Sequence, residues 1–448
     1  MSKFYSTRRF IFAAIVIIVI AASGLYAYFN VTTPKEKKVL RILSAYTPPE
    51  LTKQMGVFEQ EYEKLHPEID IVYYVTSWGD QLKTFMAEKA AGKEPDMMLT
   101  ASTQGWTLMG ENLLQPVTDL VDEIGGKKFF YPGMLDAQYI NNQYWFIPTH
   151  NSAVHVLYRK DLFSKYGLQA PPRSWDDIVK AAKTLTRDTD GDGKIDLWGV
   201  SQVMARDYFA GSYFLSWAWS NDASLLDAKG NVAIDTPNFK EALQYWSEVS
   251  SYGPPGMAEW ASAVADEAYI KGKCAMLVRA SLAAESAIYQ ADPELGKNTG
   301  LFIVPTGPHG KSPACRGSVN GWVVIKTTRN YVECKEFIKW FYKPENYIRW
   351  VLKDPLWQTP ASPVVFNMKE YQSVPAVQDM KPQLEYYLDV VVGAAREELM
   401  DSGVVNINSP KIVQSLVLTD MLQDILFRKM SIDAAVAKWK PIMQKTIS

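Results

Sequence analysis

The longest apolar run of the chain lies near its N-terminus, where residues 10–29 carry no charged side chain and follow Arg8 and Arg9. Twenty helical residues rise about 30 Å, which matches the hydrocarbon core of a bilayer. A buried core helix would rarely extend so far without a polar residue. We therefore expect residues 1–30 to form a signal anchor or a signal peptide, followed by a polar linker over residues 31–38. The length of the run favours an uncleaved anchor, and its basic flank leaves the rest of the chain outside the cytoplasm.

Strand and helix patterns then alternate along the chain. Runs rich in β-branched and aromatic residues predict strands at 39–46, 69–78 and 95–101, and apolar residues at helical spacing predict helices at 51–67 and 79–93. This order is typical of a parallel α/β sheet with right-handed crossovers. Because ligands bind beyond the carboxyl ends of such strands, we expect the loops after these strands to carry ligand-binding side chains.

Composition narrows the possible partners. A length of 448 residues suggests two or three domains. The net charge is −2 and there is no long basic run, so nucleic acid is not an expected partner. Aromatic residues make up 12% of the chain, with 14 Trp and 24 Tyr, enough to fill large cores and also to line a groove. The three cysteines, Cys274, Cys315 and Cys334, have no metal or redox spacing and permit one disulfide at most.

Five stretches of the chain, in this order, resemble one protein family. They are residues 92–120, 144–185, 188–199, 269–281 and 317–341. Together they make the chain similar, from residue 39 onward, to the extracytoplasmic solute-binding proteins of ABC importers, in the sugar-binding family that includes maltose-binding protein. The resemblance implies an α/β, two-lobed, periplasmic-binding-protein-like (Venus flytrap) fold. In that fold the chain crosses a hinge several times, and the two lobes close on a solute.

The resemblance also implies boundaries for the two lobes. Residues 39–148 are expected to form the first lobe, with 318–358 returning to it, and residues 149–317 the second, with 359–448 returning. The hinge crossings are expected near residues 148–155, 316–320 and 354–363, and the three prolines of the last stretch suit a non-helical passage.

The strongest short motif is an acidic loop that begins at residue 188. It fits the first nine positions of a calcium-binding loop, with the tight-turn glycine at Gly193 and carboxylates at Asp188, Asp190, Asp192 and Asp196. Position 12 is Gly199, where a full EF-hand has a bidentate Glu, and that change should weaken binding. The loop therefore predicts either a structural Ca²⁺ site or an Asp/Gly turn without metal. No other cofactor is expected.

Aromatic and amide side chains suggest a carbohydrate site. A sugar has an apolar face that stacks on aromatic rings and hydroxyl groups that need planar donors and acceptors. Residues of these types at loops and crossings are the candidate ligand-binding residues: Tyr46, Trp78, Asp80, Trp106, His150, Asn151, Trp219, Trp260, Arg279, Asn320 and Trp357. A single Trp is more often part of a core than of a binding surface, and Trp322, inside an apolar run, is expected in the core.

These observations predict a monomeric receptor and no enzyme. We expect it to capture a carbohydrate between its lobes and deliver it to the permease subunits of an ABC importer. The abundance of aromatic residues favours an oligosaccharide. The N-terminal helix would hold it on the outer face of the cell membrane, or cleavage would leave it secreted or periplasmic. A secreted glycosidase is the alternative, since the sequence does not exclude a suitable carboxylate pair among its 49 acidic residues, although no nucleophile elbow, HExxH or phosphate loop is present. A binding module that serves a sensor is a third possibility.

Overall fold

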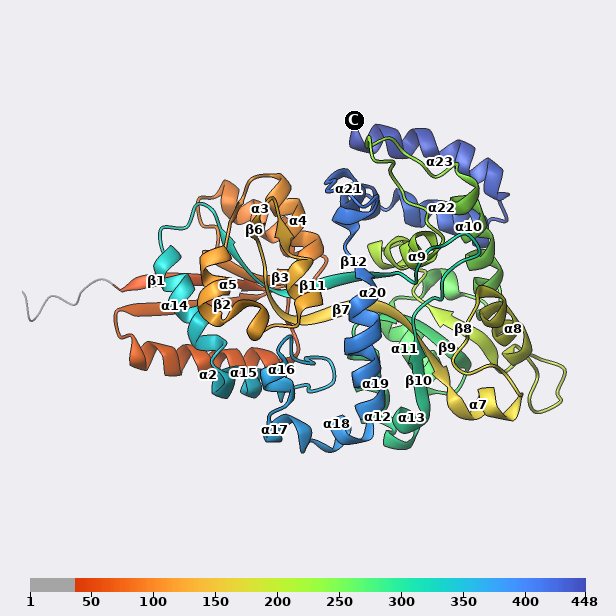
Figure 1. Cartoon of the computed structure of the whole chain (residues 1–448), viewed down its shortest axis with the longest axis horizontal. Helices are drawn as coiled ribbons and strands as arrows, with labels where there is room; N and C mark the ends of the chain where they lie inside the picture. Colours follow the sequence, from red (N-terminus) through yellow and green to blue (C-terminus); the bar gives the residue numbers. More distant parts are fainter. Residues whose placement is uncertain (1–36) are drawn as a thin grey trace, which may run out of the picture.

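Two lobes lie side by side along the long axis of the molecule (Figure 1). The computed structural model describes residues 37–448. The predicted membrane or signal helix, and nearly all of the linker, lie outside the described residues and stay predictions. Among residues 37–448, no helix is both long enough and apolar enough to cross a membrane.

The first lobe begins with the strand–helix alternation that the sequence predicts. Its strands are β1 (Lys38–Ser44), β2 (Ile69–Val75), β3 (Met97–Ala101) and β4 (Leu114–Gln115), with a small hairpin of β5 (Tyr139–Ile140) and β6 (Gln143–Tyr144). Strands β2, β1 and β3 are adjacent and parallel. The helices are α2 (Pro49–Leu65), α3 (Gln81–Ala90), α4 (Ser102–Gly110), α5 (Thr118–Ile124), η1 (Gly126–Lys128), α6 (Pro132–Asp136), α14 (Tyr331–Phe341) and α15 (Pro344–Val351).

Two long antiparallel strands, β7 (Ile147–Arg159) and β11 (Cys315–Ile325), join the lobes into one sheet (Figure 1). The strand order is β2-β1-β3-β11-β7-β9-β8. The pairing of β11 with β7 shifts register between Asn320 and Gly321. A Cβ atom on Gly321 would lie 2.0 Å from the carbonyl oxygen of Ile147, so the close approach of the two strands requires glycine. Two of the expected crossings, near residues 148–155 and 316–320, are therefore present.

The second lobe surrounds the other half of the sheet. Its strands are β8 (Trp198–Gln202), β9 (Cys274–Ala280) and β10 (Thr299–Phe302). Its helices are α7 (Lys160–Lys165), α8 (Trp175–Leu185), α9 (Tyr208–Ser220), α10 (Pro237–Ser250), η2 (Met257–Glu259), α11 (Ser262–Ile270), α12 (Ala283–Ala291) and α13 (Pro293–Asn298). A capping box at Ser174 and Asp177 fixes the start of α8.

The last part of the chain runs from the first lobe through the region between the lobes to the second lobe (Figure 1). Its elements are α16 (Pro363–Phe366), α17 (Lys369–Gln372), α18 (Pro375–Asp379), α19 (Lys381–Tyr386), a π-helical turn η3 (Tyr387–Val391), α20 (Val392–Ala394), β12 (Ala395–Arg396), η4 (Glu398–Met400), α21 (Asn408–Gln414), α22 (Val417–Leu426) and α23 (Ile432–Ile447). β12 pairs with the start of β11.

Each lobe has its own large apolar core. Val365, Tyr371 and Tyr387, from the part of the chain expected to return to the second lobe, are buried in the same cluster as the first-lobe strands. Helices α21, α22 and α23 contribute to the second-lobe cluster. The exact lobe boundaries remain a prediction. All three cysteines are buried and free.

Candidate ligand-binding cleft

Two adjoining cavities lie between the lobes. They hold about 250 and 490 Å³ and share five lining residues, Trp78, Thr103, Gln104, Tyr208 and Phe209. Trp78 follows β2, and Thr103 and Gln104 lie in the first turn of α4, whereas Tyr208 and Phe209 begin α9 in the second lobe. Because both lobes contribute to the same wall, the two cavities form one cleft whose shape depends on how the lobes are oriented.

The segments that pass between the lobes close the smaller cavity. Ser152 comes from β7, and Ser318 and Asn320 come from β11. Trp357 lies in the segment that follows α15, where a third crossing was expected. Asp354 accepts hydrogen bonds from the Trp357 backbone N–H and from the hydroxyl of Ser286 on α12, at 3.1 and 2.6 Å. The cavity therefore adjoins the elements that would move when the lobes rotate.

Tyr46 supports the two tryptophans of the wall from behind. It is fully buried, and its ring lies 5.2 Å from the Trp78 ring and 5.9 Å from the Trp357 ring, centroid to centroid. Gln104 also donates a hydrogen bond to the carbonyl of Trp78, at 2.5 Å. These contacts fix the rings before any ligand arrives, and preorganised aromatic rings lose little entropy on binding.

A buried histidine orients the amide of Asn320. Burial lowers the pKa of His150 to about 3, so its ring is neutral at physiological pH. His150 Nδ1 lies 3.3 Å from Thr149 Oγ1, which itself donates to the Asn320 carbonyl, and Nε2 lies 3.0 Å from Asn320 Nδ2. Nδ1 therefore carries the proton and Nε2 accepts from the amide. Asn320 lines the smaller cavity, and its Oδ1 takes no part in this bond to His150, so that oxygen is available as an acceptor.

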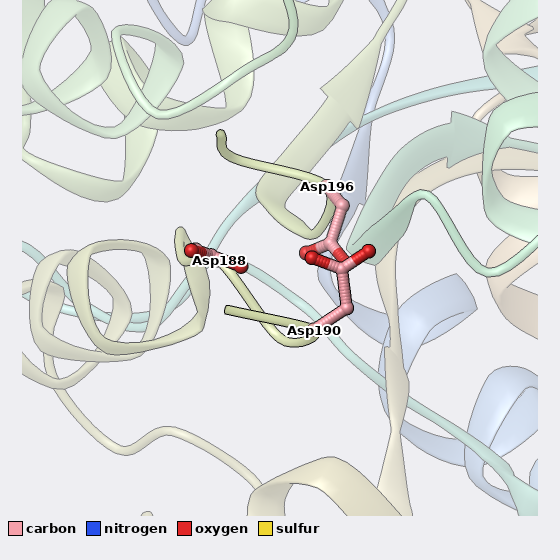
Figure 2. A group of neighbouring side chains, drawn as sticks. All are labelled: Asp188, Asp190 and Asp196. Carbon is pink, nitrogen blue, oxygen red and sulfur yellow. The ribbon is translucent and has the colours of Figure 1, made fainter. Parts of the chain in front are cut away.

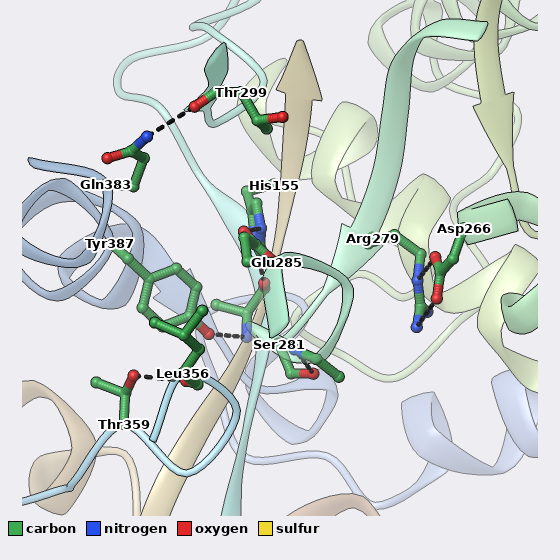
Figure 3. Close-up of polar contacts among 12 residues, drawn as sticks. His155, Asp266, Arg279, Ser281, Glu285, Thr299, Leu356, Thr359, Gln383 and Tyr387 are labelled. Atoms are coloured by element: carbon green, nitrogen blue, oxygen red, sulfur yellow. Dashed lines mark hydrogen bonds and ion pairs between the residues drawn. The ribbon is translucent and has the colours of Figure 1, made fainter. Parts of the chain in front are cut away.

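Arg279 at the end of β9 is the cation of the smaller cavity. It is 7% exposed, and Asp266 of α11 accepts from its Nε at 2.6 Å and from its Nη2 at 3.2 Å. Nη1 donates to Tyr213 Oη at 3.2 Å and to Ser262 Oγ at 3.1 Å. Figure 3 shows the parallel contacts between the guanidinium and the carboxylate. The group is held rigidly in the wall.

A second buried polar cluster lies at the crossing itself (Figure 3). His155 and Glu285 are 0–1% exposed, and His155 Nε2 lies 2.6 Å from Glu285 Oε1. His155 Nδ1 lies 3.0 Å from the Ala153 carbonyl, which can only accept, so Nδ1 is protonated. Tyr387 Oη accepts from the Ala153 N–H at 3.0 Å. These bonds tie β7 to α12 and to η3.

Residues 395–401, named below the bridging segment, connect the lobes beside the cleft. Glu397 accepts hydrogen bonds from three first-lobe side chains: Ser102 Oγ at 2.6 Å, Trp106 Nε1 at 3.3 Å and Gln138 Nε2 at 3.2 Å. Burial raises the pKa of Glu397 to about 7. This carboxyl group therefore anchors the bridging segment to the first lobe.

The same segment is bonded to the second lobe through two further acids. Glu398 accepts from Ser212 Oγ of α9 at 2.6 Å and from Arg316 Nε at 3.0 Å. Asp401 accepts from Trp219 Nε1 at 2.8 Å, and burial raises its pKa to about 6. A rotation of one lobe against the other must therefore move this segment or break one of these sets of bonds.

Four of the predicted ligand-binding residues line the smaller cavity: Trp78, Arg279, Asn320 and Trp357. Tyr46 and His150 lie directly behind that wall and are fully buried, so they act on it through their neighbours. The sequence pattern located the strand ends and crossings that carry these six residues. It did not distinguish the residues that line the cavity from those buried behind them.

The other five predicted residues lie away from both cavities. Trp106 and Trp219 are buried, and their indole N–H groups donate to carboxylates of the bridging segment. The Asn151 side-chain oxygen accepts from the Tyr387 hydroxyl. Trp260 is half-buried against second-lobe core residues. Asp80 is exposed and accepts from the hydroxyl of Ser77 in its own turn.

Sequence reasoning missed the aromatic side chains that α9 contributes. Tyr208, Phe209 and Tyr213 line the cleft, and the rings of Tyr208 and Phe209 lie 4.3 Å apart. Asp207 caps the helix by accepting from the Phe209 N–H at 2.8 Å. An N-cap residue followed by aromatic residues was the available signal, because it places them in the first turn of a helix that faces the other lobe.

The acidic loop follows α8, and none of its residues lines either cavity. Figure 2 shows its carboxylates. Carboxylate oxygens of Asp188, Asp190 and Asp196 all lie within 4.8 Å of one another, and Asp192 is not part of this group. The N–H groups of Gly191 and Gly193 donate to Asp188, and these bonds lower the pKa of its carboxyl. Three carboxylates suit Ca²⁺. Gly199 supplies no ligand, and a Cβ there would collide with the Ala182 carbonyl.

Comparison with known proteins agrees with this architecture. A protein of Escherichia coli K12 named as an ABC transporter periplasmic-binding protein (YcjN) is 23% identical over 303 residues, covering 66% of this chain and 67% of its own. Maltose-bound MalE3 of T. maritima superposes with a TM-score of 0.72 at 19% identity, covering 91% of this chain and 100% of that one. An Agrobacterium radiobacter solute-binding protein with ribitol gives 0.71 at 18%, covering 92% and 100%. The family model described as bacterial extracellular solute-binding protein matches residues 48–348. The chain belongs to the bacterial extracellular solute-binding protein family.

Proposed function

We propose that this protein is the extracytoplasmic receptor of an ABC importer and that it captures a carbohydrate in the cleft between its lobes. The observation that carries the proposal is the wall of the cleft. Aromatic rings from both lobes lie beside single, well-oriented polar groups such as the Asn320 amide and the Arg279 guanidinium. Such a wall suits a ligand with apolar C–H faces and a hydroxyl rim. The ligands named for two similar structures, maltose and ribitol, are of this chemistry.

We further propose that the ligand is an oligosaccharide. The smaller cavity continues into the larger one through five shared residues, so an elongated ligand can occupy both. Gln414 and Leu416 extend the wall of the larger cavity beyond the aromatic residues. A monosaccharide would leave this second space filled with water.

The proposed partners follow from the role. Closure of the lobes on a sugar would present a shape that the permease subunits of the importer distinguish from the open receptor. We also propose that residues 10–29 anchor the receptor to the membrane and that the receptor is a monomer.

A thermal-shift screen of the full-length protein against neutral monosaccharides, oligosaccharides and polyols tests the proposal. A ligand present at 100 times its Kd adds about 2.7 kcal/mol to the free energy of unfolding, which is a shift of several degrees. We expect an oligosaccharide to give such a shift and to be recovered intact by chromatography. Shorter products would instead establish a glycosidase, and equal affinity for a monosaccharide and its trimer would contradict the oligosaccharide.

A further inference from the structure

We propose that the cleft selects uncharged ligands. Asp266 sets this selectivity because it occupies the Nε and Nη2 N–H groups of Arg279, the pair that would otherwise bind an anion. The inference rests on the proposed function, since it names the charge class of the carbohydrate. Asp266 would act as a positioning and neutralising residue behind the wall, without touching the ligand itself.

The hydrogen-bond capacity of Arg279 is nearly used up within the protein. A guanidinium has five N–H groups. Two are directed at Asp266, and Nη1 donates to Tyr213 and Ser262. One N–H of Nη2 is left for the cavity. A carboxylate or phosphate is gripped through two parallel N–H groups, which Arg279 does not have free. A single hydroxyl oxygen needs only one.

The charge of Arg206, the cation of the larger cavity, is also balanced by a carboxylate, but the Nη1 N–H groups of Arg206 take no part in that pair. Arg206 donates from Nε to Asp420 Oδ1 at 2.7 Å and from Nη2 to Asp420 Oδ2 at 2.9 Å. The remaining charged residue of the two cavity walls is Asp207, whose carboxylate caps α9. Among the described residues that line the cleft, every charged side chain thus has a partner within the protein.

The balanced charges of the cleft decide whether a charged ligand can bind there. An acidic sugar or a sugar phosphate that enters the cleft loses its water and meets no free cation to replace it, a large cost for a buried charge. A neutral hydroxyl group loses less on desolvation and finds Asn320 Oδ1 and the last Arg279 N–H. Glu285, buried on α12 and paired with His155, is a further acidic side chain that acts on Arg279 (Figure 3).

The test is calorimetry on the full-length protein with inorganic phosphate and D-glucuronate as anionic probes, at constant ionic strength. We expect the wild-type protein to bind neither probe. Asp266→Asn keeps the shape of the side chain but removes the negative charge that balances Arg279. We therefore expect at least a tenfold gain in affinity for both anions, with a Kd in the millimolar range. The double variant Asp266→Asn/Arg279→Gln should lose the gain. Asp161→Asn, which frees the similarly bonded Arg159 outside the cleft, is the matched control and should show no gain.

Three results would overturn the inference: binding of either anion by the wild-type protein, a folded Asp266→Asn protein without the gain, or a gain that survives in the double variant. If Asp266→Asn does not fold, Asp266→Ser also removes the carboxylate that pairs with Arg279. The wild-type measurement needs no variant, because anion binding by the wild-type protein would by itself contradict the inference. Neutral glucose and maltotriose form a separate arm. If no neutral sugar binds while Asp266→Asn gains anion affinity, the carbohydrate proposal fails and the charge selectivity stands.

Discussion

At the scale of single residues, the aromatic wall is the most direct test of the site. Trp357 lies in the wall, held from behind by Tyr46. Trp357→Ala should weaken binding of the sugar identified in the screen by about tenfold or more, because a stacked ring contributes on the order of 1–2 kcal/mol at a buried contact. Titration calorimetry measures the change. Trp260→Ala is the matched control, because Trp260 lies outside both cavities, and an equal loss in the two variants would contradict the assigned wall.

The candidate residues also show which parts of the site local sequence patterns can predict. Trp78, Asn320 and Trp357 were found because each lies after a strand or at an expected crossing. Trp106 and Trp219 have equally suggestive positions, yet their indole N–H groups bond Glu397 and Asp401, which lie more than 180 residues away. No periodicity records a partner at that separation, so the side on which such a ring packs could not be predicted.

At the scale of elements, the contact between β7 and β11 depends on one glycine. Gly321→Ala would place a methyl group against the Ile147 carbonyl, which is backbone and cannot rotate away. We expect a loss of about 1–3 kcal/mol in the free energy of unfolding, measured by urea denaturation. Gly393→Ala has open space around the added atom and should be nearly neutral. A neutral Gly321→Ala would mean that the strands separate at little cost.

The acidic loop is a second element with a clear test. We propose that Asp188, Asp190 and Asp196 bind a structural Ca²⁺, weakly, since position 12 supplies no ligand. After chelation, added Ca²⁺ should release heat and raise the melting temperature of the full-length protein. Asp190→Ala should abolish both effects, whereas Asp192→Ala, outside the group, should retain them. A protein that gives no heat and no thermal shift has a metal-free turn at this position.

At the scale of the whole molecule, the bridging segment makes stability depend on pH. Burial raises the pKa of Glu397 from 4.5 to about 7, so the folded protein keeps a proton that the unfolded chain releases between these values. The unfolded state binds fewer protons in that window, so the free energy of unfolding falls as the pH rises through it, by up to about 3 kcal/mol.

Glu397→Gln should remove that fall, because its side chain is neutral throughout. Urea unfolding at pH 5 and pH 7.5 measures the difference. Glu59 and Asp401, with pKa values raised by burial to about 7 and about 6, contribute in the same direction but remain in the variant, so the comparison isolates Glu397. Glu50→Gln, at an exposed position of α2, is the control. Parallel profiles for wild type and Glu397→Gln would refute the assignment.

The resemblance of five stretches to one family predicted the two lobes and two of the crossings from sequence alone. It also placed residues 359–448 in the second lobe, and helices α21, α22 and α23 contribute to that core. Val365 and Tyr371 belong to the same range, which the resemblance assigned to the second lobe, yet both are buried in the first-lobe core. A hydrophobic stripe shows that one face of a helix is buried. Which lobe buries that face depends on the fold and is not recorded in the stripe.

The order of strands in the shared sheet also governs how the chain can be assembled during synthesis. β11 is the neighbour of β3, although more than 200 residues separate them. The first lobe therefore stays incomplete, with an unpaired strand edge, until residue 325 has emerged, and by then most of the second lobe is already available to fold. A nascent chain that stops short of β11 exposes that edge to other chains. Truncations before residue 315 should accordingly aggregate, and the full sheet should form in one late step.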